Sequence, residues 1–361
     1  NCGGHAFATE GLLLGPILEE FKAKRGEIAH TVAPAYNKGL IAKGYDPPVE
    51  IATQRVTVQG GIGTAQENSL MHSFYEVDGT GWATPFLLVP EVANVDEEHL
   101  AKLAAATDED VYLSESSPLS VSYWMLRGSS SEHARLDRIA KGKPGSPCPK
   151  GFLYTNKEFS DRAICLASRR YQKEKLRQIE QAERSKAQRD RIRGQVLDKA
   201  CICHELGGGV TRNLDIDMSI NPTVCCGPNI VNFSKVATMD EMVGHIYGRG
   251  SLLTNVHRPH MFVRELMLYV DEFGKEIYDL KIGLSKRKPI FFEKFENNLR
   301  AGIAYYHDLV SALPEQERSQ FVHALKVETR RFEQLLARHL ADTGVPGVAP
   351  SSRRTLEISN L

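Results

Sequence analysis

Apolar residues recur at two different intervals along the first hundred positions of the chain. The run at 11–24 spaces them three and four apart and ends in basic residues, which predicts a helix with one buried face. The runs at 54–59 and 82–92 are β-branched or continuously apolar, which is typical of buried strands. Between them, the run at 65–75 favours a helix. This alternation of strand and helix predicts a parallel α/β architecture.

The pattern changes further along the chain, where longer helices are predicted. Residues 113–145 are rich in Ser, Pro and Gly, so the chain is expected to leave its first domain there, near residue 125. Helices are expected at 96–107, 168–199, 239–247, 259–273 and 289–340, with a Cys- and Gly-rich segment at 201–233. The residues from 342 on are rich in Pro, Gly, Ser and Arg, which indicates a loose tail.

The charge balance narrows the classes of partner. Lys and Arg together number 45, and so do Asp and Glu, so no overall field points to nucleic acid, a membrane surface or an acidic partner. No stretch reaches the roughly 18 apolar residues that a membrane helix requires, and no signal peptide precedes the first motif. We therefore expect a cytoplasmic protein. Seven cysteines, an odd number, then indicate reduced thiols that pack, bind metal or react.

A turn rich in glycine follows the first predicted strand. It consists of Gly60, Gly61, Ile62, Gly63 and Thr64 and is called the glycine turn below. Glycines permit positive φ angles and close approach, so several N–H groups of such a turn can point at one anion. The start of the next helix would add a favourable dipole. A tight turn without a ligand explains this run, taken alone, equally well.

A second turn of small residues, with Ala83 and Thr84, is expected near 81–84, where the strand after the glycine turn would end. In (β/α)8 barrels the last two such loops commonly bind phosphate, so two adjacent turns favour a phosphorylated cofactor. One βα unit earlier, Gly3 and Gly4 precede His5, which would place an imidazole on the same face of a barrel. A His at a turn can also serve as a purely structural hydrogen-bonding group.

In this order, the motifs resemble those of the nitronate monooxygenase-like flavoproteins. That family has a Gly-Gly-His turn after its sixth barrel strand, a Gly-rich phosphate loop after the seventh, and a Gly-Thr-small-Phe turn after the eighth. The corresponding segments here are Gly3-Gly4-His5, the glycine turn, and Ala83-Thr84-Pro85-Phe86, with Ala at position 83 where Gly is usual. The likeness extends over about residues 1–235. Because each motif is short, their order carries the comparison.

The resemblance implies an FMN-dependent oxidoreductase whose residues 1–125 form the last units of a (β/α)8 TIM barrel. FMN phosphate would lie against the glycine turn and the turn that follows it, and His5 would match the active-site His. Three βα units cannot close a barrel, so the first five strands are expected from an upstream segment or another chain. Behind the barrel we expect a Cys-containing extension with a basic helix at 126–235, a helical region at 236–341 and a flexible tail at 342–361.

Four cysteines could form a separate metal site. Cys148, Cys165, Cys201 and Cys203 would supply four thiolates, a ligand set that suits zinc or an iron–sulfur cluster. Their spacing is not that of a C-x2-C knuckle, however, and Cys is also among the residues most often buried as plain hydrophobes. Both interpretations stay open.

Two functions from different classes are therefore expected. The first is an FMN-dependent oxidoreductase that binds a small organic substrate at the C-terminal face of the barrel, with His5 as general base or hydrogen-bond donor and the flavin as the redox group. The alternative is a Cys-ligated metal-binding subunit or a scaffold without flavin chemistry of its own. A homo-oligomer could form in either case.

Overall fold

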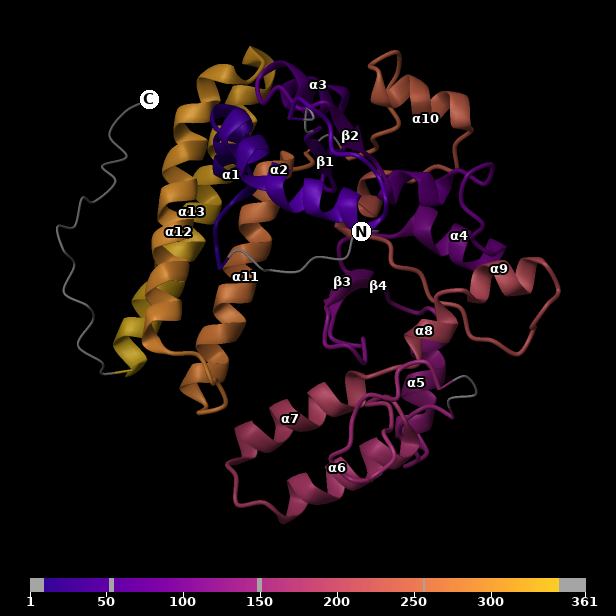
Figure 1. Cartoon of the computed structure of the whole chain (residues 1–361). Helices are drawn as coiled ribbons and strands as arrows, with labels where there is room; N and C mark the ends of the chain where they lie inside the picture. Colours follow the sequence, from indigo (N-terminus) through magenta and orange to yellow (C-terminus); the bar gives the residue numbers. More distant parts are fainter. Residues whose placement is uncertain (1–9, 52–54, 148–150, 256, 344–361) are drawn as a thin grey trace.

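The computed structural model describes residues 10–51, 55–147, 151–255 and 257–343. The chain is mostly helical, with two short two-stranded sheets (Figure 1). The first α-helices are α1 (Leu14–Ala23), α2 (Arg25–Ala42), α3 (Ala65–Ser73), α4 (Glu97–Ala105), α5 (Ser130–Ala140), α6 (Arg169–Gln181) and α7 (Lys186–Asp198). They are followed by α8 (Ile202–Glu205), α9 (Gly208–Asn213), α10 (Met239–Ile246), α11 (Met261–Lys281), α12 (Pro289–Leu309) and α13 (Glu315–Thr343).

Strands and 3-10 helices are short and lie between these helices. The strands are β1 (Thr57–Gln59), β2 (Gly79–Gly81), β3 (Val111–Ser114) and β4 (Tyr123–Leu126). The 3-10 helices are η1 (Thr84–Leu88), η2 (Pro228–Asn232) and η3 (Val310–Ala312). Strands β1 and β2 pair in parallel, and β3 and β4 form an antiparallel pair.

The larger hydrophobic core is formed by helices α1, α11, α12 and α13 with α3 and β1. Figure 1 shows α11, α12 and α13 running alongside one another on one side of the molecule. Helices α1 and α12 approach closely because Gly302 has no side chain: a Cβ there would lie 2.6 Å from Leu13. This core joins residues 13–77 to residues 261–336, two segments that are far apart in the sequence.

Helix α1 begins without a capping side chain of its own. The N–H of Leu14 instead donates to both carboxylate oxygens of Glu265, on α11, at 2.9 and 3.1 Å. The hydroxyl of Tyr306, on α12, donates to the same carboxylate at 2.8 Å. A carboxylate at this position satisfies a helix N–H group and is favoured by the helix dipole. Burial raises the pKa of Glu265 to about 7.

A second core surrounds the antiparallel hairpin. Val111 pairs with Leu126 and Leu113 with Trp124, so these four apolar side chains share one face of the hairpin. They pack with α4, η1 and η2 in a cluster that includes Phe233. Helices α6 and α7 pack mainly on each other and extend away from this core (Figure 1).

The predicted TIM barrel is wrong. The described residues hold one parallel pair of three-residue strands and one antiparallel hairpin, so the eight parallel strands of a barrel are not present in them. The run at 82–92 illustrates the cause. It contains Pro85 and Pro90, which have no N–H to give to a sheet, and it folds as η1 and a turn, while the strand itself lies earlier, at β2.

Most of the predicted helices are confirmed, with changed limits. The runs at 11–24 and 65–75 contain α1 and α3, and α4, α10 and α11 also lie where helices were predicted. The run at 168–199 divides into α6 and α7, because the chain bends at residues 182–185 and Ser185 starts the second helix with a capping box. Pro314 separates α12 and η3 from α13.

Helix α2 was not predicted, and none of its residues is buried. It could not be predicted from hydrophobic periodicity because its apolar positions do not form a continuous buried stripe. The expected domain limits near 125, 235 and 341 stay predictions.

Candidate functional site

The two predicted phosphate-binding turns lie at neighbouring strand ends. Strands β1 and β2 are parallel and in register, with Gln59 opposite Gly81 at their C-terminal ends. The glycine turn follows Gln59 directly, and the second turn follows Gly81. The predicted placement of the two turns beside each other, at the ends of adjacent parallel strands, is therefore confirmed, although the sheet does not continue into a barrel.

The glycine turn has the backbone conformation that its glycines permit. Gly60 and Gly61 have φ angles of +94° and +79°, in the region that favours glycine. Both are exposed, and a Cβ at Gly60 would have open space around it. Thr64 ends the turn as the N-cap of α3, where its hydroxyl accepts from the N–H of Glu67 at 3.0 Å. The first N–H groups of α3 therefore lie beside the turn and have no carbonyl acceptor within the helix.

A buried ion pair lies beneath this turn. Nη1 of Arg258 donates to Oε1 of Glu67 at 2.6 Å and Nη2 donates to Oε2 at 3.0 Å, with both side chains at most 5 % exposed. The N–H groups of Gly63 and Met261 also donate to this carboxylate, at 2.8 and 2.7 Å. Burial alone would raise the pKa of Glu67, but the charge and hydrogen bonds of Arg258 hold it below its usual value. Glu67 is therefore a fully partnered carboxylate.

The same region holds the carbonyl groups of the turn. Gly61 O accepts from Nη2 of Arg258 and from Nδ2 of Asn229, each at 2.8 Å. Gly63 O lies 3.0 Å from Nε2 of His245. In a trans peptide the N–H points away from the preceding carbonyl. The N–H groups of Ile62 and Thr64 are therefore directed away from the buried side chains, as anion binding by this turn would require.

His245 lies between the two turns. Its Nδ1 accepts from the N–H of Leu252 at 3.2 Å, so Nε2 carries the proton that is donated to Gly63 O. Its ring meets Trp82, the first residue after β2, edge to face at a centroid distance of 5.8 Å. Burial lowers the pKa of His245 and favours this neutral form. The indole Nε1 of Trp82 is buried without a hydrogen-bond partner in the described part of the chain.

The sequence alone did not single out the residues beneath the turn. Arg258 is 191 positions from Glu67, and Asn229 is 168 positions from Gly61, so no local spacing connects them. His260, two positions after Arg258, acts as the N-cap of α11. An Arg side chain is almost never fully buried unless it is paired, so its burial would predict a partner such as Glu67. Burial cannot be recognised from a single sequence, however.

Of the other predicted cofactor residues, the structure describes Ala83 and Thr84. Ala83 is exposed and is the N-cap of η1, in which Thr84 is the first residue. Its φ angle of −123° needs no glycine, so the replacement of the family's Gly at this position costs no strain. Gly3, Gly4 and His5 lie outside the described residues.

Among the described residues, Cys165, Cys201 and Cys203 do not form a group of three that could hold one metal ion. Cys201 is the N-cap of the short helix α8 and Cys203 lies within it, and residues two apart do not share a helix face. Cys165 lies in the turn that leads to α6. Within the described residues, the group of metal-ligating side chains that lies together is Asp96, Glu98 and His99, and it contains no cysteine. Cys148 lies outside the described residues, so a site that includes it stays a prediction.

The Asp96 and His99 pair is a structural link rather than an open metal site. Nδ1 of His99 is 2.8 Å from Oδ1 of Asp96, and Nε2 accepts from the N–H of Ser130 at 3.3 Å. Both ring nitrogens are therefore engaged, and His99 is fully buried. The pair fixes the start of α4 to the start of α5.

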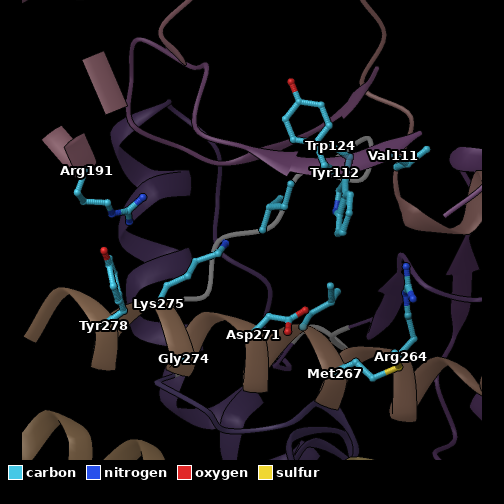
Figure 2. Close-up of a pocket in the computed structure, with 12 residues that line it drawn as sticks. Val111, Tyr112, Trp124, Arg191, Arg264, Met267, Asp271, Gly274, Lys275 and Tyr278 are labelled. Atoms are coloured by element: carbon cyan, nitrogen blue, oxygen red, sulfur yellow. The ribbon is translucent and has the colours of Figure 1, made fainter. Parts of the chain in front are cut away.

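A cleft of about 640 Å³ separates the hairpin β3–β4 from α11. Figure 2 shows Trp124 projecting from the hairpin toward the charged side chains Asp271 and Lys275 of the helix. Its charged residues have partners of opposite sign: Arg191 with Asp279, Arg264 with Asp108, Lys275 with Glu272, and Asp271 with Arg331. Because these charges are compensated, the lining does not define the charge of a ligand, and the turns above remain the better-defined site.

Comparisons with family models, with curated proteins and with solved structures find no match for this chain. In the part of the chain that the structure describes, none of the helices combines the length and the apolar character needed to cross a membrane.

Proposed function

We propose that this chain contributes the phosphate-binding end of an FMN site in a flavin-dependent oxidoreductase that acts on a small organic substrate. The observation that carries the proposal is the pair of turns at the ends of two adjacent parallel strands, the first with positive φ angles at Gly60 and Gly61. Such turns, followed by a helix N-terminus, are ready-made sites for phosphate.

The chemistry of the glycine turn fits a phosphate group. The exposed Gly60 leaves open space for close approach, and the carbonyls of Gly61 and Gly63 are held on the opposite side by Arg258, Asn229 and His245. Phosphate is an acceptor of hydrogen bonds, so donors must face it and carbonyls must not. When bound, the flavin would supply the redox chemistry, while the chain binds and orients it.

Two parts of the proposal rest on the resemblance in sequence alone. These are the identity of the cofactor as FMN and the role of His5 as general base. The alternative, a metal-binding or scaffold subunit built on the cysteines, has no comparable geometric support among the described residues, because Cys165, Cys201 and Cys203 do not form a cluster.

FMN and riboflavin differ only in the phosphate, so their dissociation constants test the site directly. We expect the full chain to quench FMN fluorescence with a lower Kd than riboflavin, and inorganic phosphate to compete with FMN. Gly60→Asp should weaken FMN binding by 10-fold or more, because a carboxylate about 5 Å from a phosphate at an effective dielectric constant of about 20 costs more than the ~1.4 kcal/mol of a tenfold change.

Gly44→Asp is the matched control. Gly44 also has a positive φ, of +80°, and nothing within 4 Å of a Cβ, but it lies at the end of α2. It should leave FMN binding unchanged. Equal Kd values for FMN and riboflavin, or equal effects of the two Asp variants, would rule out the proposal.

A further inference from the structure

We infer that His245, Asn229 and Arg258 are positioning residues for anion binding by the glycine turn. The inference rests on the proposed function. These three side chains come from α10, from η2 and from the segment before α11, and each donates to a carbonyl of the same turn. They hold the carbonyl side of these peptides, opposite the N–H groups of Ile62 and Thr64, so their effect on an anion would pass through the backbone.

The turn needs such support because of its composition. Three of its five residues are glycines, which sample more backbone conformations than any other residue and lose more entropy when they are fixed. Rotation of one peptide unit would exchange an outward N–H for an outward carbonyl and would repel a phosphate. A hydrogen bond to Gly63 O fixes the peptide that contains the N–H of Thr64, and the bonds to Gly61 O fix the N–H of Ile62.

His245 is the most informative of the three. It donates to Gly63 O in the glycine turn and packs its ring against Trp82, which directly precedes the second turn. Phe233 meets the ring from another side at a centroid distance of 5.4 Å, and the side chain is 3 % exposed. One neutral imidazole therefore fixes the spacing of the two turns as well as the direction of a peptide.

Two substitutions test the hydrogen bonds of the two ring nitrogens separately. In His245→Gln the amide nitrogen can take the place of Nε2 and donate to Gly63 O. In His245→Asn the shorter amide reaches only the place of Nδ1, so the bond from Leu252 N–H can persist while that to Gly63 O is lost. We expect Asn to weaken FMN binding by about 10-fold, with riboflavin binding unchanged, and Gln to remain within about 3-fold of the wild type.

Asn229→Asp is a second variant, in case the substitutions at His245 prevent folding. It keeps the acceptor for Nε of Arg258 and places a negative charge beside that cation, but it removes the donors to Gly61 O and Ile62 O. It should weaken FMN binding about 10-fold as well, with riboflavin binding by the folded protein unchanged.

The outcomes separate the two claims. If the wild-type chain binds FMN no better than riboflavin, the proposed function fails. If the wild type prefers FMN and both His245→Asn and Asn229→Asp keep the full preference, the proposed function stands and the positioning role is refuted. Equal weakening of FMN and riboflavin by His245→Asn and His245→Gln alike would also overturn it, because it would show that the residue only maintains the fold.

Discussion

Replacement of Arg258 by Met should reveal how much the fold depends on the buried ion pair. The change removes two hydrogen bonds to Glu67, one to Gly61 O and one to Oδ1 of Asn229, and it leaves the carboxylate at 2 % exposure with only backbone donors. Removal of one partner from such a pair typically costs about 3–5 kcal/mol. We expect a loss of that size in the free energy of unfolding.

The loss should depend on pH in a defined direction. Without Arg258, burial is the dominant influence on Glu67 and should raise its pKa above the unfolded value of about 4.5. Between these two pKa values the folded state keeps a proton that the unfolded state has released. A rise in pH through this range therefore lowers the stability of the folded state. The variant should therefore lose more stability at pH 8 than at pH 5. Urea unfolding followed by tryptophan fluorescence measures this, because Trp82 contacts His245 beside the pair.

The double variant Glu67→Met/Arg258→Met serves as the control. It removes the uncompensated charge, and apolar replacements of buried pairs are often neutral or stabilising. It should recover much of the lost stability. A single variant that loses less than about 1 kcal/mol at pH 8, or a double variant no more stable than the single one, would refute the view that the stranded charge causes the loss.

Three further predictions concern stability. His260→Asn keeps an N-cap acceptor but removes a buried imidazole whose pKa burial lowers to about 4. Between pH 6.5 and pH 5 the variant should therefore lose about 2 kcal/mol less free energy of unfolding than the wild type. An equal loss in both proteins, measured by urea unfolding, would contradict this. Glu265→Gln removes a carboxyl whose pKa is raised to about 7, so the decline in wild-type stability from pH 5 to pH 8 should be smaller in the variant, and an unchanged decline would show that Glu265 is ionised throughout. Gly63→Ala should lower the melting temperature markedly more than Gly39→Ala, because a Cβ at Gly63 would lie 2.7 Å from the Arg258 guanidinium, whereas Gly39 lies within α2 with nothing within 4 Å of a Cβ; equal melting temperatures would be evidence against this packing.

Local sequence signals predicted local structure well. The strand, the glycine turn and the helix at residues 57–73 follow from β-branched residues, glycines and the capping residue Thr64. A parallel pair was also predicted, because a strand, a helix and a second strand occur in this order. The predicted second strand, at 82–92, was wrong: β2 lies just before it, at Gly79–Gly81. These signals describe single βα units, which occur in many architectures.

The sequence could not predict how far the sheet extends or what lies beneath the turn. Each βα unit has the same pattern in a barrel as in an isolated pair, so the barrel was inferred from a resemblance and not from the residues. The carbonyls of the glycine turn are held by side chains 168–197 positions away, which only the folded chain brings together. The lowered pKa of Glu67 likewise depends on Arg258 and could not be predicted from its neighbours in sequence.

The larger core has a consequence for the order of folding during synthesis. Residues 13–77 bury their apolar side chains against residues 261–336, so the first segment leaves the ribosome about 180 residues before its partner is made. At translation rates of about 5–20 residues per second, its apolar surface would remain exposed for about 10–40 s. The hairpin β3–β4 and its neighbours α4 and η2 all lie between these segments and can assemble in that interval. A chaperone that binds exposed apolar segments would therefore have most time to act on the first 77 residues of this chain.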